Sequence, residues 1–321
     1  MSEMVKVVVD AMGGDNAPEE PVKAAVEAVK EKENIQVILT GVQDVIEAEL
    51  RKYPDYPKDR IRVVHASQVI ETAEPPVMAI QKKKDSSIVV GLNLVKKQEA
   101  DAFVSSGSTG AVLVGGQVIV GRIKGVERPP LAPLIPTKDG VALLIDCGAN
   151  VECTPEFLLQ FGVVGSLYAQ KAMGMDCPRV GLLNNGTEDS KGPALQKEAY
   201  ALLAQAGQAG VLNFVGNTEA RDVPLGQVDV IVCDGYAGNI LLKSIEGTAM
   251  FMGSMVKGMF KKNWVTKLGA LCCKSGIREM MATLDYREVG GTALLGIRKP
   301  VIKAHGSSDP RAFRSAIRQA M

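Results

Sequence analysis

Residues 7–16 read VVVDAMGGDN, and this stretch decides the fold. Three consecutive valines predict a buried strand, and the glycine pair that follows Asp10 predicts a turn directly after it. The same order of apolar strand, acidic residue, glycine-containing loop and asparagine returns in LLIDCGAN at 143–150 and in VIVCDGYAGN at 230–239. Repeated transitions of this kind are typical of an α/β protein with parallel strands.

Polar side chains follow all three of these strands. Ligands of open parallel sheets bind beyond the carboxyl ends of the strands, so we expect these side chains to gather at one binding cleft. The alternative is that each Asp or Asn only caps the helix that follows it. The residues are Asp10, Asp15, Asn16, Asp146, Asn150, Asp234 and Asn239, with Gly13 and Gly14 in the first loop.

Outward from these motifs, short apolar runs of strand length alternate with segments of helical period. Val22, Val26 and Val29, for example, lie on one face of a predicted helix. The pattern predicts a doubly wound, mostly parallel sheet, assigned to a single α/β domain over 1–321, although two lobes would also fit the chain length. The predicted strands are 5–9, 35–39, 61–64, 102–105, 131–135, 141–145, 180–183, 213–215 and 228–232.

Composition narrows the function classes. The 321 residues have a formal net charge of +1 and only 4% aromatic side chains, so we expect no nucleic-acid partner. Six cysteines without a CxxC pair predict neither a zinc site nor a disulfide framework. The start of the chain lacks the long apolar region of a signal peptide, which favours a cytoplasmic protein with reduced cysteines.

Two further loops could bind a phosphate-sized anion, because backbone N–H groups at the start of a helix favour negative charge. One is SSGSTG at 105–110 and the other is HGSSD at 305–309. Ordinary turn chemistry is the alternative for each. Neither a Walker A motif nor G-x-G-x-x-G is present, so no nucleotide is implied. The candidate residues are Ser106, Gly107, Ser108, Thr109, His305, Gly306, Ser307 and Ser308.

Cysteine nucleophiles and a membrane span are weaker interpretations. Cys147 and Cys233 adjoin the loop aspartates, but a free cysteine is commonly a small buried hydrophobe. Residues 102–121 carry no charge, yet their serines and glycines favour a strand, a turn and a buried helix. Residues 245–284 contain no predicted strand, and we expect an amphipathic helical excursion there.

Five motifs together resemble one protein family. They are VDAMGGDNAP at 9–18, KKKDSSIVVGLNLVK at 82–96, VGRIKGVERPPLAP at 120–133, DCGANVECTPE at 146–156 and VIKAHGSSD at 301–309. In this order they look like phosphate acyltransferases, the acyl carrier protein:phosphate transacylases of phospholipid synthesis. The resemblance implies a fold similar to phosphotransacetylases and to isocitrate and isopropylmalate dehydrogenases. It also implies a homodimer without a metal or nucleotide cofactor.

The implied reaction moves a long-chain acyl group from acyl carrier protein to inorganic phosphate. Phosphate is itself the nucleophile, so the protein has to position it and to donate hydrogen bonds to the developing oxyanion. A membrane-bound glycerol-3-phosphate acyltransferase would take the product. We expect Lys191 or His305 to supply a positive charge or a hydrogen-bond donor. Asp234 and Asn239 would orient the substrate or shuttle a proton, and Asn184 would help to bind the substrate.

Two departures from the family pattern limit these roles. Asn16 stands where the family often has histidine, so we assign it only a hydrogen-bonding role. The loop NNGTEDSKG at 184–192 also differs from the usual family version. The roles of Asn184 and Lys191 depend on this loop.

The resemblance also gives the helical excursion a meaning, since family members contact membranes peripherally through an exposed amphipathic helical pair. Between Glu246 and Glu279 there are six basic residues against two acidic ones, which suits anionic lipid headgroups. The alternative is packing of its Met-rich face in a dimer interface. The expected contact residues are Met255, Met259, Phe260 and Trp264.

Other functions stay open at this point. A phosphotransacetylase that uses coenzyme A shares the reaction type, and a basic patch at Arg122, Lys124 and Arg128 could instead receive acidic acyl carrier protein. A decarboxylating dehydrogenase of similar fold would use a metal ion and NAD. A third interpretation is a lipid-surface interaction module without enzymatic activity.

Overall fold

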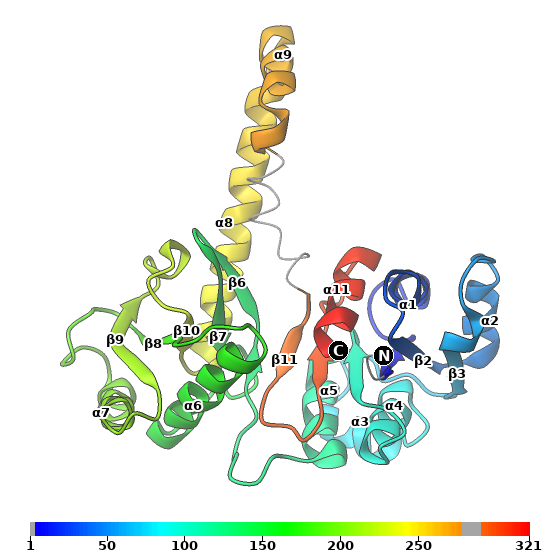
Figure 1. Ribbon diagram of the computed structural model, residues 1–321, viewed down its shortest axis with the longest axis horizontal. Helices are drawn as coiled ribbons and strands as arrows, with labels where there is room; N and C mark the ends of the chain where they lie inside the picture. The colour runs from blue at the N-terminus through cyan, green and yellow to red at the C-terminus, as the bar shows by residue number, and fades with distance from the viewer. Residues whose placement is uncertain (1–3, 278–289) are drawn as a thin grey trace. The chain divides into compact units, whose positions relative to one another are not determined.

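The computed structural model describes residues 4–277 and 290–321 (Figure 1). By packing, the chain divides into two compact units: unit 1 comprises Met1–Leu131 and Arg287–Met321, and unit 2 comprises Ala132–Tyr286. Each unit has its own sheet covered by helices, so the predicted α/β class is confirmed. Whether the units act as a single domain stays a prediction.

Unit 1 is built on a sheet with the VVVD stretch near its middle. Over the described residues this sheet has seven strands, in the order β3-β2-β1-β4-β12-β11-β5. All neighbours from β3 to β12 pair in parallel, and β11 is antiparallel to β12. The strands are β1 Val5–Asp10, β2 Ile35–Gly41, β3 Ile61–His65, β4 Ala102–Ser105, β5 Leu131–Ala132, β11 Thr292–Leu294 and β12 Val301–Lys303.

Helices cover both faces of this sheet. Val7, Val8 and Val9 are all fully buried, as expected for a parallel strand with apolar side chains on both faces. α1 packs against α11, while α4 and α5 pack elsewhere on the sheet (Figure 1). The helices are α1 Glu19–Glu31, α2 Gln43–Leu50, α3 Pro76–Lys82, α4 Ser87–Lys96, α5 Thr109–Gly115 and α11 Pro310–Ala320, with a 3-10 turn Lys58–Arg60 and a π-helical segment Gly116–Val120 that continues α5.

Unit 2 repeats this design on a smaller scale. In its described part, a sheet of five strands has the order β6-β7-β10-β8-β9, parallel except for β6 against β7. α6 and α7 pack against each other and on the sheet, and α8 begins against β7. The elements are β6 Leu134–Thr137, β7 Gly140–Ile145, β8 Arg179–Asn184, β9 Asn213–Glu219, β10 Val230–Val232, α6 Pro155–Lys171, α7 Ala194–Gln208, α8 Gly235–Lys261, α9 Trp264–Cys272 and a 3-10 turn Val223–Leu225.

α8 begins in the core of unit 2 and continues well beyond it (Figure 1). Its buried residues Gly235, Gly238 and Leu241 all lie in the first two turns. α9 packs against α8 and starts at a capping box, in which Asn263 and Thr266 satisfy each other's backbone N–H groups. The predicted helical excursion is therefore confirmed up to residue 277, and residues 278–284 of that prediction lie outside the described residues. Among the helices described, none combines the length and apolar character needed to cross a bilayer.

The structure departs from the predicted strands in two places. The run 131–135 forms two short strands, β5 and β6, separated at Pro133, because proline has no N–H to donate to a ladder. β11 and β12 were not predicted, because each has only three residues and β12 directly follows Pro300. The uncharged stretch 102–121 forms β4, a turn, α5 and the π-helical segment, as expected.

Two glycines of α8 should respond oppositely to alanine. A Cβ on Gly238 would lie 2.0 Å from the backbone oxygen of Asp146, whereas nothing lies within 4 Å of a Cβ on Gly258. We predict that Gly238→Ala lowers the free energy of unfolding by about 3 kcal/mol or more, through overpacking. Gly258→Ala should raise helix stability by up to about 1 kcal/mol. Denaturant unfolding of both variants checks this; an equal response would contradict the close packing of α8 on the Asp146 loop.

Candidate active site

Three neighbouring parallel strands of unit 1 end in polar residues at the same edge of the sheet. β1 ends at Asp10, β4 at Ser105 and β12 at Lys303, and β4 lies between the other two. Ser105 is directly paired with Lys303 in register. The loops that follow these strands therefore meet at the carboxyl edge, where ligands of open α/β sheets bind.

Asp10 is the buried centre of this edge. Its carboxylate accepts hydrogen bonds from the Ser105 hydroxyl at 2.7 Å and from the Met12 N–H at 3.1 Å. Burial raises the pKa of Asp10, and these hydrogen bonds act against that rise. A buried carboxyl so fully engaged supports the loops around it rather than facing solvent.

Glycine allows the first loop to touch the second. A Cβ on Gly13 would lie 2.5 Å from Asp10 Oδ2 and 2.6 Å from the Gly107 nitrogen. Gly14 has a φ of +93°, and a Cβ there would lie 2.5 Å from the Ser106 hydroxyl oxygen. Side chains larger than hydrogen are therefore excluded at both positions.

Hydrogen bonds tie the three loops together. The Ser106 hydroxyl donates to the Gly13 carbonyl at 2.8 Å, and the Asp15 N–H donates to the Gly306 carbonyl at 2.9 Å. The Ser108 hydroxyl caps α5 by accepting from the Ala111 N–H. Thr109, Asp15 and Asn16 are exposed, whereas Ser106 and Ser108 are buried.

The last loop has an exposed histidine. His305 Nδ1 accepts a hydrogen bond from the Ser307 N–H at 3.2 Å and lies 2.9 Å from the Ser307 hydroxyl. An accepting Nδ1 places the ring proton of neutral histidine on Nε2. The Ser308 N–H donates to the His305 carbonyl, and Asp309 caps α11 by accepting from the Ala312 N–H.

Lys303 lies at the base of these loops. Its ammonium donates to the Ser106 carbonyl at 3.3 Å and to the Ala304 carbonyl. Burial lowers the pKa of Lys303 to about 8, while Asp10 and Asp15 oppose that shift. Sequence reasoning assigned no role to Lys303, because β12 was not predicted, and it placed Ser105 in the candidate anion loop without identifying Asp10 as its partner.

Unit 2 has a second polar edge. Asp146, Asp234 and Asn184 lie at the carboxyl ends of β7, β10 and β8, and β10 lies between the other two strands. The buried Asp146 accepts from the N–H groups of Cys147 at 2.7 Å and Asn150 at 2.6 Å. Asp146 thus resembles Asp10 in holding the turn that follows its own strand.

The other predicted residues of unit 2 differ in exposure and in hydrogen bonding. Asp234 caps α8 by accepting from the Ala237 N–H at 2.9 Å, while Asn239 is exposed one turn further along. Asn184 donates to the Lys191 carbonyl at 3.2 Å and so shapes its loop. Lys191 is exposed, with Glu188 at 3.9 Å.

The structure thus gathers the predicted residues into two groups. Unit 1 holds Asp10 to Asn16, Ser106 to Thr109 and His305 to Ser308, and unit 2 holds Asp146, Asn150, Asn184, Lys191, Asp234 and Asn239. Helix capping, the alternative considered for single residues, is observed at Asp234, Ser108 and Asp309. That both groups form one cleft stays a prediction.

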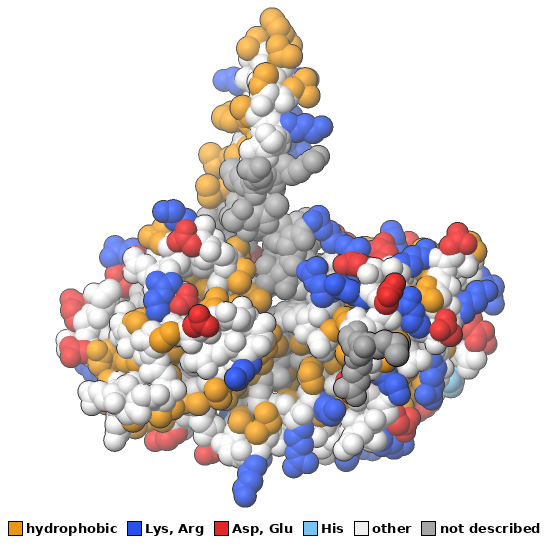
Figure 2. Space-filling view, viewed as in Figure 1, with side chains coloured by type: hydrophobic (Ala, Val, Ile, Leu, Met, Phe, Trp, Pro, Cys, Tyr) orange, Lys and Arg blue, Asp and Glu red, His pale blue; other side chains and the backbone are white. Residues whose placement is uncertain are grey.

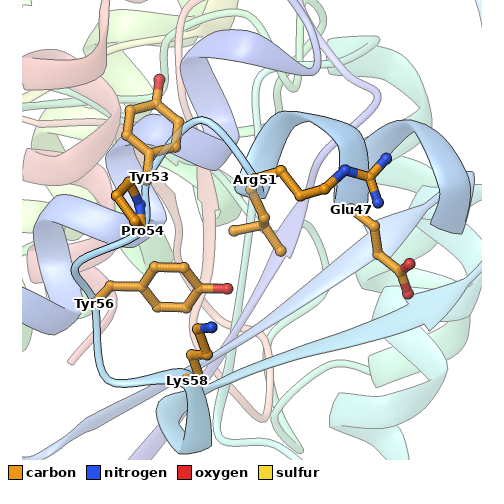
Figure 3. A pocket seen from close by; sticks show the side chains of 7 residues that line it. Glu47, Arg51, Tyr53, Pro54, Tyr56 and Lys58 are labelled. Carbon is orange, nitrogen blue, oxygen red and sulfur yellow. The ribbon is translucent and has the colours of Figure 1, made fainter.

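A hollow in unit 1 lies elsewhere. It measures about 370 Å³ and is lined by Tyr53, Tyr56, Arg51 and Lys58 among others (Figure 3). Its lining residues come from the end of α2 and from the segment that connects α2 to the start of β3. The hollow therefore lies toward the amino edge of the sheet, away from the carboxyl ends of the strands described above. We assign it no part in the candidate site.

Comparisons with known proteins agree with this fold. Residues 5–321 match the family described as "Fatty acid synthesis protein". The phosphate acyltransferase of Alkaliphilus oremlandii is 52% identical over 317 residues, which cover 99% of this chain and 93% of the relative. The phosphate acyltransferase of Thermoanaerobacter pseudethanolicus is 47% identical over 316 residues, 98% of this chain and 92% of the relative.

Among solved structures, a phosphotransacetylase from Streptococcus pyogenes has a TM-score of 0.64 at 17% identity, covering 99% of this chain and 93% of that one. A putative 4-hydroxythreonine-4-phosphate dehydrogenase from Salmonella typhimurium has a TM-score of 0.54 at 11% identity, covering 100% and 99%. At such identities the likeness shows a shared fold, as the sequence predicts.

Cysteine reactivity gives a direct test of the site electrostatics. Burial raises the pKa values of Cys147 and Cys153 to about 12, and that of Cys233 well above its usual range. Thiolate at these positions should therefore be scarce at neutral pH and increase only toward pH 12. We predict that a thiol reagent at pH 7 labels the exposed Cys177, Cys272 and Cys273 quickly, and labels Cys147 and Cys233 only after unfolding.

Peptide mass spectrometry of labelled protein distinguishes the six positions. The exposed cysteines serve as internal controls for reagent activity. Rapid labelling of Cys147 in the folded protein would contradict the inert thiol and would restore it as a candidate nucleophile.

Proposed function

The chain belongs to the fatty acid synthesis protein family and is a relative of phosphate acyltransferases, and on that premise we propose that this acyltransferase moves a long-chain fatty acyl group from acyl carrier protein to inorganic phosphate. The product is an acyl phosphate for phospholipid synthesis. Coenzyme A as the carrier is the competing proposal, since a phosphotransacetylase shares the fold.

The reaction balances without a protein nucleophile. An oxygen of hydrogen phosphate attacks the thioester carbonyl carbon and forms a tetrahedral oxyanion. Collapse of this intermediate breaks the carbon–sulfur bond, and the departing carrier thiolate takes up the proton that the phosphate loses. The inert cysteines are compatible with this scheme, because positioning and oxyanion stabilisation are all it requires.

The observation that carries the proposal is the meeting of three tied loops at the carboxyl edge of unit 1. Two of these loops run into helices, α5 and α11, and an anion is favoured at the start of a helix. The N–H groups of Gly107, Ser307 and Ser308 already donate to Ser105 or His305, so the other N–H groups and the hydroxyls of these loops would hold the anion. We place phosphate against Gly107 to Thr109 and Gly306 to Ser308, with the Nε2–H of His305 as a donor. The buried Ser106 contributes by holding the Gly13 loop in place.

We assign unit 2 the carrier-side chemistry. Asp234 and Asn239 lie at the start of α8 and would orient the thioester or shuttle a proton, and Lys191 would supply positive charge from an exposed loop. Asp146, Asn150 and Asn184 support these loops through their hydrogen bonds. Removing one oxyanion donor typically costs about 2.7 to 4 kcal/mol of transition-state stabilisation.

A basic loop of unit 1 supports an acidic carrier protein as the donor. Arg122, Lys124 and Arg128 are all exposed on residues 121–130. The loop is fixed to the turn before β12, where the Ile123 N–H donates to the Gly296 carbonyl at 2.8 Å and Arg298 Nε donates to the Arg122 carbonyl at 3.1 Å. Together with the exposed Arg298, this surface has four cationic side chains, which would be complementary to an acidic partner.

The far end of α8 and α9 supports peripheral contact with an anionic membrane. Met255, Met259 and Trp264 are exposed by 58%, 56% and 76%, while Phe260 is half-buried. Lysines are interspersed with these apolar side chains, as Figure 2 shows over α8 and α9. Apolar insertion together with attraction of lysine to lipid headgroups is the usual basis of such contact.

The remaining partners follow from the family resemblance. We propose a homodimer on the cytoplasmic face of the membrane, with a membrane-bound glycerol-3-phosphate acyltransferase consuming the acyl phosphate. The alternative use of the Met-rich face, in a dimer interface, is an outcome of the membrane experiment below.

The donor can be identified by one assay. We predict that purified protein releases free thiol from palmitoyl acyl carrier protein only when inorganic phosphate is present, and that hydroxylamine traps an equal amount of acyl product. Palmitoyl coenzyme A should be a poor donor. Equal or better use of palmitoyl coenzyme A would favour the phosphotransacetylase proposal, and no phosphate dependence would refute both.

A charge-reversed variant separates carrier docking from chemistry. Lys124→Glu combined with Arg128→Glu should raise the KM for palmitoyl acyl carrier protein about tenfold and leave the KM for phosphate unchanged. The matched control is Lys58→Glu, an exposed lysine just before β3 at the opposite end of the strand order. An unchanged carrier KM in the double variant would exclude this surface.

Membrane contact should depend on the exposed methionine. We predict that Met259→Glu reduces flotation with phosphatidylglycerol liposomes severalfold, because a carboxylate replaces an inserted apolar side chain. The control is Val211→Glu, which changes an equally exposed apolar residue of unit 2. Unchanged flotation with a lost dimer would support the dimer interface, and no change in either would refute both roles.

A further inference from the structure

Lys303 brings a cation to the phosphate side of the proposed site. It ends β12 and pairs in register with Ser105 of β4, whose hydroxyl donates to Asp10 of β1 at 2.7 Å. The three side chains thus end three adjacent parallel strands. Because successive loops leave from these residues, Lys303 lies beneath both loops proposed to hold phosphate.

The contacts of Lys303 leave its charge without a direct counterion. The acceptors of its ammonium are two neutral backbone carbonyls, those of Ser106 and Ala304. Within the described part of the chain, no carboxylate lies within ion-pair distance of its Nζ. A lysine ammonium has three N–H donors, so one donor is available beyond these two carbonyls.

The carboxylates near Lys303 do not fully balance its positive charge. Asp10 on β1 is committed to Ser105 and Met12, and Asp15 in the next loop is exposed. His305 lies two residues further along the chain from Lys303. Burial outweighs the attraction of both aspartates and lowers the pKa of Lys303 to about 8. An anion bound at the loops would offset the cost of keeping a desolvated ammonium there.

We propose that Lys303 is a phosphate-positioning residue: it bridges the Ser106 and His305 loops and presents its remaining N–H to the bound anion. The proposal rests on the proposed function for the identity of the anion. It assigns Lys303 a role in ground-state binding of phosphate and none in binding the acyl carrier.

Three variants test it. Lys303→Met removes the positive charge but keeps a side chain of similar length, and Lys303→Arg keeps the charge. The control, Lys299→Met, removes the charge of a lysine that lies just before β12 and forms an ion pair with Asp101 at 3.7 Å. We expect Lys303→Met to raise the KM for phosphate about 10- to 100-fold, as for loss of a charged hydrogen bond, with the carrier KM within twofold. Lys303→Arg should recover part of the loss, and Lys299→Met should behave as the unchanged protein.

The pH dependence of phosphate binding distinguishes a lysine that contacts the anion from one with a purely structural role. The ammonium is present below its pKa of about 8 and is lost above it, so phosphate binding should weaken as pH rises from about 7 to 9.5. Over this range that weakening should be absent in Lys303→Met. A flat profile in the unchanged protein would contradict the inference even where a variant fails to fold.

Binding and turnover are measured separately. Equilibrium dialysis with radiolabelled inorganic phosphate reports on Lys303 without any acyl donor, so loss of binding in Lys303→Met would support the inference even if acyl carrier protein were the wrong donor. An unchanged phosphate KM, an equal rise in both KM values, or a flat pH profile in the unchanged protein would each overturn it. Absence of thiol release from acyl carrier protein, with phosphate binding intact, would refute the proposed function alone.

Discussion

A carboxylate buried at the end of a strand is the constraint on which both units depend. Asp10 and Asp146 are each completely buried, and each is satisfied by N–H groups of the turn that it precedes. A buried carboxylate without such donors would be costly, so the chain must turn tightly enough to present them. A glycine also packs against each carboxylate. Gly13, in the turn after Asp10, leaves no room for a side chain beside it, and Gly235, the first residue of α8, leaves none beside Asp146, where a Cβ would lie 2.7 Å from the carboxylate. The turns after Asp10 and Asp146 therefore have few other conformations that would still satisfy these buried carboxylates.

Much of this could be predicted from sequence. The VVVD, LLID and VIVCD transitions each begin with an apolar run that identifies a buried strand, and the acidic residues after these runs correctly marked the carboxyl edges. The helical excursion was predictable from its length and its apolar face. What failed was the short, late part of unit 1: three-residue strands carry too little periodicity to detect, so β12 was missed and Lys303 with it.

The division into two groups of site residues could not be derived from local pattern either. Similar motifs at 7–16, 143–150 and 230–239 look equivalent in sequence, yet the first belongs to one sheet and the other two to a second. Which sheet a strand joins is decided by the packing of distant segments, such as the return of 290–321 to unit 1. Ser105 shows the same limit, because its partner Asp10 is 95 residues away in the chain.

α8 has a mechanical consequence. Its N-cap is Asp234, at the polar edge of unit 2, and Met259 lies in its last turn, so one uninterrupted helix joins the two. At 1.5 Å per residue, 25 residues span about 38 Å. If the far end contacts lipid headgroups as proposed, this helix would place the Asp234 edge up to about 38 Å from them. Under the proposed function, the apolar tail of an acyl product would then need shelter from water over that distance before it reached the lipid.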